Sequence, residues 1–311
     1  MRFIVTGGAG FIGSNLCRLL LREGHRVVCI DNFQTGRREN VEELVNTGRF
    51  TLVEHDVREP FSIDSPIDGI YNLACPASPP HYQADPIGTI MTSVMGTKNC
   101  LDIAHSHNVS MVQASTSEIY GDPAISPQPE GYWGNVNPCG PRSCYNEGKR
   151  CAEALCYSYR TTYDTDVKIA RLFNVYGPYM DPHDGRVVSN FIVQALSEVP
   201  LTIYGSGEQT RSFCYIDDLV RGLYALIQTP SSFQGPVNLG NPTEITVMDL
   251  ARAVLAKIGG PSRVEHRPLP TDDPHRRKPD ITLALDNLPW RPEVSLDEGL
   301  DHTIAYFRRV R

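Results

Sequence analysis

The chain has 311 residues, of which 41% are hydrophobic and 21% charged, enough apolar material for one large folded unit or two packed ones. The formal net charge of -7, with basic residues scattered along the chain, argues against a nucleic-acid partner. No apolar run approaches the roughly 20 residues that span a bilayer, and Arg2-Phe3-Ile4-Val5 opens no signal-peptide pattern, so we expect a cytoplasmic protein without a membrane partner.

In the first half, short apolar runs alternate with helical patterns. Strands are expected at 3–5, 27–30, 51–53, 70–73, 111–114 and 167–170, with helices near 11–23, 88–107 and 142–163. This alternation predicts an α/β fold with a doubly wound parallel sheet, that is, a Rossmann domain.

After about residue 174 the pattern becomes mixed, with Gly- and Pro-rich turns and helices near 187–198, 217–228, 246–258 and 295–309. We therefore expect a Rossmann domain at 1–173, with returning segments near 213–240, and a smaller mixed α/β capping domain, mainly at 174–311. A cleft between the two is the natural ligand site.

The nine cysteines are an odd number without a Cys-x-x-Cys pair. Several of them, including Cys17, Cys29 and Cys156, fall in apolar periodic stretches. This pattern indicates small buried side chains, and neither a disulfide framework nor a metal site.

A glycine motif lies at the first strand-to-helix turn. The segment 7–13 reads Gly-Gly-Ala-Gly-Phe-Ile-Gly, so glycines stand at Gly7, Gly10 and Gly13. Such glycines allow a tight turn and let backbone N–H groups approach a pyrophosphate. Asp31 closes the second strand, where an acid accepts hydrogen bonds from an adenosine ribose.

The acid at Asp31 favours NAD over NADP, because a carboxylate would repel a 2′-phosphate. The neighbouring Arg37 and Arg38 keep NADP open. Asp56, at the end of the third strand, either contacts the adenine amine or is an ordinary loop acid.

Tyr145 and Lys149 lie four residues apart and therefore on one face of the helix near 142–163. A nearby ammonium favours phenolate and lowers the phenol pKa from about 10. Such pairs also occur on solvated helix faces, but the place of this pair behind a dinucleotide motif indicates a catalytic base.

The fifth strand ends in Thr116, Ser117 and Glu118, and ligands meet the carboxyl ends of strands in such sheets. The hydroxyls can bind a sugar hydroxyl, and Glu118 can supply a second acid or base. Ordinary turn chemistry is the alternative.

Together, 6–13, 31–36, 115–121 and 145–150 resemble the extended short-chain dehydrogenase/reductases. Within them, the chain is similar to the UDP-glucuronate decarboxylases, or UDP-xylose synthases. That similarity continues over essentially the whole chain, in 76–80, 132–138, 184–191, 201–211 and 277–280.

The resemblance implies an NAD-dependent carboxy-lyase that converts UDP-glucuronate through a 4-keto intermediate to UDP-xylose. NAD would be recycled within each turnover. The resemblance also implies a homodimer, with the helices near 88–107 and 142–163 at its interface.

The resemblance also implies roles for single residues. Tyr145 would take the proton of the sugar 4-hydroxyl, Thr116 would hold that hydroxyl, and Lys149 would lower the Tyr145 pKa and hold the nicotinamide ribose. Ser117 and Glu118 would face C5 and the carboxyl group. The expected substrate-binding residues are Asn174, Arg186, Tyr204, Gln209, Arg211 and Arg277. The expected NAD-binding residues are Gly7, Gly10, Phe11, Ile12, Gly13, Asp31, Asn32, Phe33, Thr35, Gly36, Asp56, Val57, Leu73, Ala74, Thr92, Tyr145 and Lys149.

Two segments depart from the family pattern. Met91-Thr92-Ser93 stands where these decarboxylases usually read Lys-Thr-Asn, and Cys75 replaces a usual Ser. If these departures remove polar contacts from the site, a share of UDP-4-keto-xylose is expected to leave before its reduction.

Two other enzyme classes share the Tyr/Lys oxidation, namely nucleotide-sugar 4-epimerases and 4,6-dehydratases. A dehydratase would more often carry Asp-Glu after the Thr, where this chain has Ser117-Glu118. An NAD-sensing regulator is the non-enzymatic alternative. The sequence leaves open whether the nucleotide base is uridine or thymidine.

Overall fold

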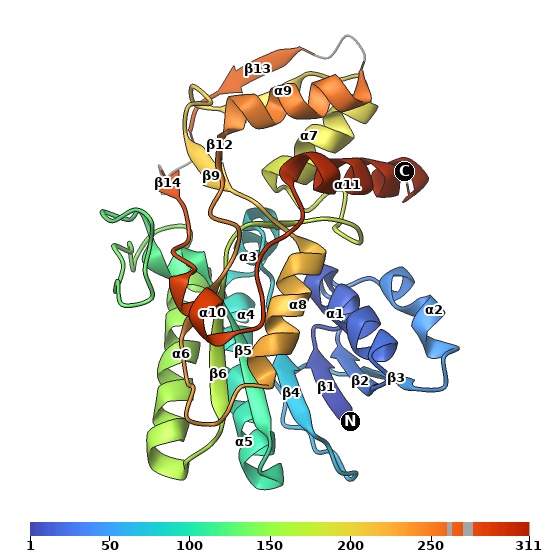
Figure 1. Ribbon diagram of the computed structural model, residues 1–311, viewed down its shortest axis with the longest axis vertical. Coiled ribbons are helices and arrows are strands. Elements are labelled where there is room, and N and C mark those ends of the chain that lie inside the picture. The colour runs from blue at the N-terminus through green and yellow to red at the C-terminus, as the bar shows by residue number, and fades with distance from the viewer. Residues whose placement is uncertain (260–262, 270–275, 311) are drawn as a thin grey trace.

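A seven-stranded parallel sheet forms the centre of the computed structural model, which describes residues 1–259, 263–269 and 276–310 (Figure 1). Its strand order is β11-β6-β5-β4-β1-β2-β3, and every neighbouring pair is parallel. The strands are β1 Arg2–Thr6, β2 Arg26–Asp31, β3 Phe50–Glu54, β4 Gly69–Asn72, β5 Ser110–Thr116, β6 Val167–Leu172 and β11 Val237–Leu239. The six predicted strands and the doubly wound sheet are confirmed, whereas the seventh strand, β11, was not expected.

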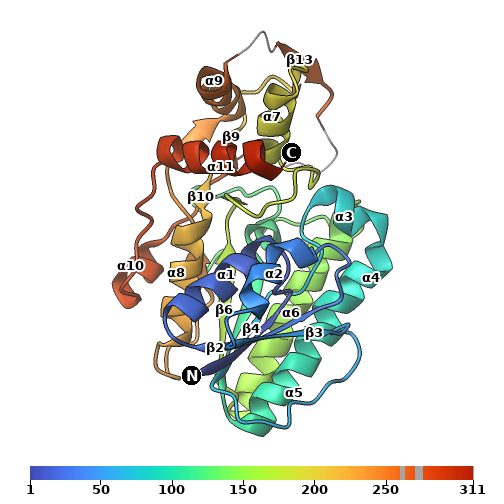
Figure 2. The same cartoon turned by 90° about the vertical axis from the view of Figure 1, so that its right-hand side faces the viewer.

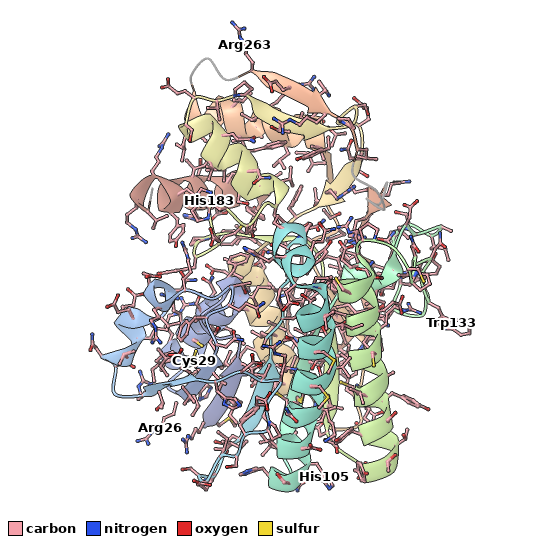
Figure 3. All side chains as sticks on the ribbon, turned by 180° about the vertical axis from the view of Figure 1, so that it is seen from behind. Arg26, Cys29, His105, Trp133, His183 and Arg263 are labelled. Atoms are coloured by element: carbon pink, nitrogen blue, oxygen red, sulfur yellow. The ribbon has the colours of Figure 1, made fainter. Side chains whose placement is uncertain are left out.

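Both faces of the sheet are covered by helices, which explains why its strands are apolar without alternation. In β1, Phe3 and Val5 point into one hydrophobic core, and Ile4 points into the other. One face packs against α1 Phe11–Arg22 and α8 Ile216–Ile227. The other packs against α5 Thr97–His107 and α6 Ser143–Tyr163, which stand side by side in front in Figure 3.

The predicted helix near 88–107 is one rod with an irregular middle. It consists of α4 Pro86–Met91, a π-helical turn at Thr92–Gly96, and α5. The π turn packs against α6. Single π turns inside helices are frequent at functional sites, and this one places the buried Thr92 at the cavity described below.

The second half of the chain builds a mixed layer above the carboxyl ends of the sheet strands (Figures 1 and 2). Its main elements are α7 Val187–Leu196, β8 Leu201–Tyr204, β9 Thr210–Ser212, β12 Glu244–Thr246, α9 Val247–Ile258, β13 Val264–Arg267, β14 Arg276–Arg277 and α11 Leu296–Val310. β9 pairs with both β12 and β14, and β8 pairs with β13. The remaining short elements are α2 Glu42–Val45, α3 Pro79–Ala84, β7 Val175–Tyr176, β10 Cys214–Tyr215 and α10 Thr282–Asn287, with 3₁₀ turns at Arg38–Asn40 and Ser117–Tyr120.

The sheet has its topological switch point between β1 and β4, where such folds bind ligands. The turns after these two strands touch, because a Cβ added to Gly7 would lie 2.9 Å from the Cα of Ala74. Gly7 also has a φ of +66°, which favours glycine.

All nine cysteines are free, and Cys17, Cys29 and Cys156 are buried as expected. Across the part of the chain that the structure describes, no helix combines the length and apolar character needed to cross a membrane.

The close packing around Gly13 yields a first prediction. A Cβ at Gly13 would lie 2.1 Å from the Gly7 carbonyl oxygen, so the turn must shift. We expect Gly13→Ala to lower the free energy of unfolding by about 1–3 kcal/mol, the usual cost of overpacking, and to weaken binding at this turn. Urea denaturation measures the first effect. Gly131→Ala is the control, because a Cβ there meets nothing within 4 Å; equal stability of the two variants would contradict the prediction.

Candidate active site

One cavity opens at the carboxyl ends of β1, β4 and β5 and is roofed by the mixed layer. All of the predicted catalytic and substrate-binding residues line it. The predicted cofactor residues line it as well, except for Phe33 and Asp56. The cavity thus brings together residues that are up to 270 positions apart in the sequence, from Gly7 to Arg277.

The glycine turn fits a pyrophosphate. Gly10 is the N-cap of α1, makes no side-chain cap, and is followed by a first turn without an acidic residue. The N-terminus of α1 therefore offers free N–H groups and a positive dipole end to the cavity. Gly10, Phe11, Ile12 and Gly13 line the cavity here, and the close contact at Gly13 leaves no room for a side chain.

Asp31 lines the cavity next to the glycine turn. Its carboxylate accepts hydrogen bonds from the backbone N–H groups of Ala9 (2.9 Å) and Phe33 (2.8 Å). Burial raises the pKa of this carboxyl, and these N–H groups oppose the shift. The backbone N–H of Gly10 also contributes. Since the two carboxylate oxygens together offer about four acceptor sites, capacity for a ribose hydroxyl remains.

The two predicted cofactor residues outside the cavity are occupied elsewhere. The carboxylate of Asp56 accepts from the Arg58 guanidinium (2.6 Å) and from the Asn32 amide (3.0 Å). Hydrogen bonds from Arg58 lower its pKa to about 2. The ring of Phe33 stacks with the Arg38 guanidinium at 4.1 Å. The contacts of Asp56 with Arg58 and Asn32 are those of an ordinary loop acid, which was one of the two alternatives for this residue.

Tyr145 is buried at the base of the cavity, and burial raises its phenol pKa, as does the nearby Cys75 thiol. A hydrogen bond with Thr116 acts in the opposite direction. The Lys149 ammonium donates to the Ala114 carbonyl oxygen (2.9 Å) and lies 5.9 Å from the Tyr145 ring centre. The Tyr145 pKa is therefore raised, and not lowered as the spacing of Lys149 predicted, because desolvation dominates.

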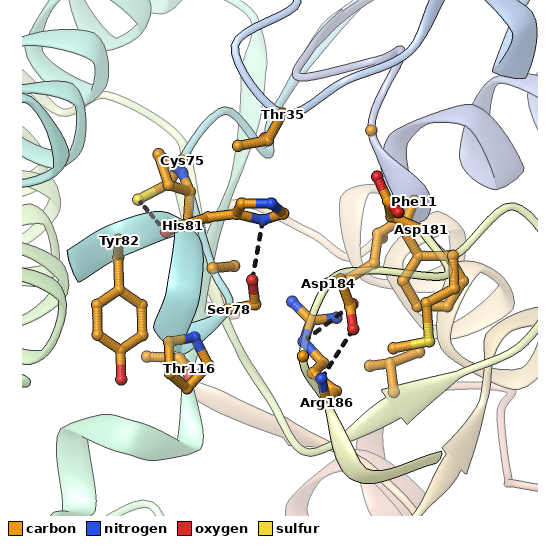
Figure 4. A pocket seen from close by; sticks show the side chains of 18 of the residues that line it. Phe11, Thr35, Cys75, Ser78, His81, Tyr82, Thr116, Asp181, Asp184 and Arg186 are labelled. Atoms are coloured by element: carbon orange, nitrogen blue, oxygen red, sulfur yellow. Dashed lines mark hydrogen bonds and ion pairs between the residues drawn. The ribbon is translucent and has the colours of Figure 1, made fainter. Parts of the chain in front are cut away.

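A second tyrosine, which the sequence did not single out, orders this region. The ring of Tyr82 stacks on that of Tyr145, with centroids 5.1 Å apart and planes 5° apart. Its hydroxyl accepts from Nε of Arg142 (3.1 Å). Figure 4 shows Tyr82 near Thr116, together with the hydrogen bond that joins Ser78 to His81 on the same segment. Arg142 could have been noticed, since it precedes Tyr145 by three residues.

Glu118 lies among several arginines of the site. Its carboxylate binds the guanidinium of Arg277, which reaches it from β14 of the mixed layer, and lies 3.5 Å from that of Arg142. Burial alone would raise the Glu118 pKa, but Arg277, Arg142 and Arg211 lower it to about 2. Glu118 is therefore ionised at neutral pH. Arg277, which was expected to bind the nucleotide, contacts this carboxylate in the free protein.

The residues of the mixed layer that were predicted to bind substrate have polar groups that are only partly satisfied. The side-chain NH₂ of Asn174 is buried and has no hydrogen-bond partner among the described residues. Arg186 pairs with Asp184 at 3.6 Å but leaves donors facing the cavity, as Figure 4 shows. Gln209 donates to the Tyr204 carbonyl oxygen (2.7 Å). A buried donor without a partner is costly, so this region suits a ligand rich in acceptors.

The departures from the family pattern do not all lie in the cavity. Met91 is 42% exposed on the outside of α4 and does not line the cavity, so its substitution removes no contact there. Ser93 is buried, and its hydroxyl lies 3.2 Å from the Cys75 sulfur. Cys75 and Ser93, two of the three departures, thus form one hydrogen-bonded pair. Met91 no longer supports the hypothesis that the departures remove polar contacts from the site.

The chain matches known proteins over nearly its full length. The model of the NAD dependent epimerase/dehydratase family matches residues 3–240. UDP-glucuronic acid decarboxylase 1 of Arabidopsis thaliana is 51% identical over 308 residues, which cover 99% of this chain and 70% of the relative. UDP-glucuronic acid decarboxylase 1 of Xenopus tropicalis is also 51% identical, over 99% of this chain and 72% of the relative.

Solved structures share the fold at lower identity. UDP-glucuronic acid 4-epimerase from Bacillus cereus, in complex with UDP-glucuronic acid and NAD, has a TM-score of 0.89 and 29% identity and covers 100% of both chains. A dTDP-glucose 4,6-dehydratase from Streptomyces venezuelae, with NAD bound, has a TM-score of 0.88 and 27% identity over 99% of this chain and 97% of that one.

The ionised state of Glu118 gives a prediction about stability and pH. Its folded pKa of about 2 lies below the ordinary value of about 4.3, so the ionised group stabilises the fold above pH 4.3, and this stabilisation is lost as the pH falls towards 2. We expect Glu118→Gln to be less stable than the wild type at pH 7, with a difference that shrinks at pH 3.5. Urea unfolding at both pH values measures it. The matched change Glu265→Gln, at an exposed residue, serves as the control, and a Glu118→Gln deficit that is independent of pH would refute the assignment.

Proposed function

The chain belongs to the NAD dependent epimerase/dehydratase family, and we propose that it is a carboxy-lyase that converts UDP-glucuronate to UDP-xylose with NAD as a recycled cofactor. The decarboxylases of Arabidopsis and Xenopus, each 51% identical over 99% of the chain, support this activity.

The observation that carries the proposal is the group of arginines that line the cavity around Glu118. The guanidinium groups of Arg142 and Arg277 both lie against the Glu118 carboxylate, and Arg211 acts on the same carboxylate from nearby. Guanidinium groups suit a carboxylate ligand. A hexuronate, which carries a carboxylate at C6, therefore fits this region better than a neutral hexose.

The dinucleotide would lie along the glycine turn, with its adenosine towards Asp31 and its nicotinamide towards Lys149. When bound, NAD supplies the hydride acceptor for C4 of the sugar and the hydride donor for the later reduction. Leu73, Ala74, Val57 and Thr92 would line its path, and Asn32, Thr35 and Gly36 would surround the ribose.

The catalytic residues act on protons and on charge. In its ionised form, which a nearby cation such as Lys149 favours, Tyr145 accepts the proton of the C4 hydroxyl, and Thr116 holds that hydroxyl by a hydrogen bond. A ketone at C4 is β to the C6 carboxylate, so the electrons of the C5–C6 bond can move towards the C4 oxygen as carbon dioxide leaves. The hydroxyls of Tyr145 and Thr116 stabilise the enolate oxygen that forms. Ser117 and Glu118 face C5, where a proton is then added.

A 4-epimerase is the second candidate, because the UDP-glucuronic acid 4-epimerase of Bacillus cereus has the same fold and an acidic sugar as its ligand. An epimerase would keep the C6 carboxylate. The release of carbon dioxide therefore separates the two functions.

We also propose the division into an NAD-binding part at 1–173, with returning segments near 213–240, and a capping part mainly at 174–311, which enclose the nucleotide sugar between them. A homodimer would form through the outer faces of α4, α5 and α6. Ile87, Met91 and Tyr157 are large exposed apolar side chains on α4 and α6, and burying them would stabilise such a contact.

Incubation with UDP-glucuronate and NAD⁺ is the direct test. We expect carbon dioxide and UDP-xylose from the wild type, with chromatography revealing any UDP-4-keto-xylose. Tyr145→Phe removes the general base and should lower the rate by about 10²–10⁴ while retaining NAD binding. Tyr163→Phe, at an exposed position near the end of the same helix, should behave as the wild type. Formation of UDP-galacturonate without release of carbon dioxide would favour the epimerase. A Tyr145→Phe variant with the wild-type rate would contradict the role of Tyr145 as the general base.

Cofactor choice depends on the charge of Asp31. We expect a preference for NAD⁺ over NADP⁺ that narrows in Asp31→Ala, because the carboxylate no longer repels a 2′-phosphate or binds the ribose. The ratio of the two dissociation constants, measured by titration, reports the effect. Asp31→Asn keeps the shape without the charge and should narrow the ratio as well. An unchanged ratio in both variants would contradict the role of Asp31.

A further inference from the structure

Asn238 lies in the middle of β11, fully buried behind the active site, with all of its polar groups bonded. Its backbone N–H donates to the Glu130 carboxylate (2.8 Å), and its side-chain carbonyl accepts from the Tyr120 hydroxyl (2.9 Å). Its side-chain NH₂ donates to the carbonyl oxygens of Gln128 and Asp280, both at 2.9 Å. One amide thus ties together three separate segments.

Two of these segments carry the two partners of the central ion pair. Tyr120 ends the short 3₁₀ turn Ser117–Tyr120, which also holds Glu118. Asp280 ends the segment 276–280, here called the strap, which holds Arg277. Asn238 therefore binds both the turn and the strap, and the same two segments are also joined by the ion pair between Glu118 and Arg277.

The strap has no other regular structure after β14, and Gln128 fixes it. The N–H of Gln128 donates to the Lys278 carbonyl oxygen (2.9 Å), and the N–H of Lys278 donates to the side-chain oxygen of Gln128 (2.8 Å). The N–H of Asp280 donates to the Gln128 carbonyl oxygen (3.0 Å). The same Gln128 carbonyl oxygen also accepts a hydrogen bond from the side-chain NH₂ of Asn238, so Asn238 and the strap are bound to one atom of Gln128.

The Tyr120 side of the network reaches the catalytic helix. Arg171 donates to the Tyr120 hydroxyl (2.9 Å) and forms a two-point ion pair with Glu153 of α6 (3.0 and 2.7 Å). The hydroxyl of Ser115, next to Thr116, also donates to Glu153 (2.5 Å). The network is thus continuous from the strap to the strand and helix that carry Thr116 and Lys149.

We propose that Asn238 is a positioning residue for the carboxylate-handling half of the reaction. It fixes the position of Arg277 relative to Glu118. The position of this ion pair in turn determines the electrostatic environment of the C6 carboxylate of the substrate. Asn238 contacts the segment of Arg277 directly, through Asp280, and reaches the strand of Thr116 only through Tyr120, Arg171 and Glu153. We therefore expect the loss of carbon dioxide to depend on Asn238 much more than the oxidation at C4 does. The inference rests on the proposed decarboxylation.

The test separates the two half-reactions in a single turnover. Bound NADH, followed by its absorbance after mixing with UDP-glucuronate, reports the oxidation at C4, and trapped carbon dioxide reports the loss of C6. Asn238→Asp keeps the shape and the acceptor for Tyr120 but removes the two donors to Gln128 and Asp280. Tyr120→Phe keeps the buried ring and removes only the hydroxyl, so it provides a milder variant if Asn238→Asp does not fold.

We expect both variants to form NADH at the wild-type rate and to release carbon dioxide about 10- to 10²-fold more slowly, since small misplacements of a charged group have effects of this size. Bound NADH should therefore accumulate. The matched control is Tyr71→Phe, the same change at a buried tyrosine whose hydroxyl has no partner among the described residues; it should match the wild type in both rates.

Equal slowing of NADH formation and carbon dioxide release in Tyr120→Phe would show a general structural role and overturn the proposal. Wild-type release of carbon dioxide by Tyr120→Phe would overturn it as well. If the wild type forms NADH but releases no carbon dioxide, the proposed function itself fails, and this result is recognisable before any variant is made.

Discussion

The buried ion pair between Glu118 and Arg277 is the contact on which the arrangement of the active site depends, because it joins the end of the central sheet to the layer above it. Neither charge could remain alone in that position, since breaking a buried pair by removing one partner typically costs about 3–5 kcal/mol. Arg142 adds to the pair and extends it through Tyr82 to the ring of Tyr145. Glu118, Tyr145 and the roof of the cavity are therefore positioned by one connected set of contacts.

The sheet and the glycine turn could be predicted because their signals are local. Strands buried on both faces are continuous apolar runs, and the turn at 7–13 needs glycines for reasons of space, as the contact at Gly13 shows. β11, β9, β12 and β14 have only two or three residues each, too few for any periodicity, and pairing partners far away in the sequence define them. They could not be read from the chain alone.

Properties set by the surroundings of a side chain were harder to foresee than its position. The spacing of Tyr145 and Lys149 correctly places both in one cavity, but the free protein buries the phenol and lets the ammonium bind Ala114, so the Tyr145 pKa rises. Likewise, residue 91 precedes the cavity residue Thr92 directly, yet helix geometry turns Met91 to the outside. In both cases the deciding quantity is solvent contact, which a motif does not encode.

The fold by itself does not select the reaction, since an epimerase and a dehydratase share it with TM-scores of 0.89 and 0.88. Charge can distinguish an acidic sugar from a neutral one. In the proposed reaction the C6 carboxylate enters as an anion and leaves as neutral carbon dioxide, so a site that only offered guanidinium groups would be left with uncompensated buried charge after each turnover. Glu118 reduces this problem because it pairs with both Arg277 and Arg142, so part of their charge is compensated whether or not a substrate carboxylate is present. Because the Glu118 carboxylate stays beside these arginines, the site can remain stable both before the substrate carboxylate binds and after it leaves as carbon dioxide.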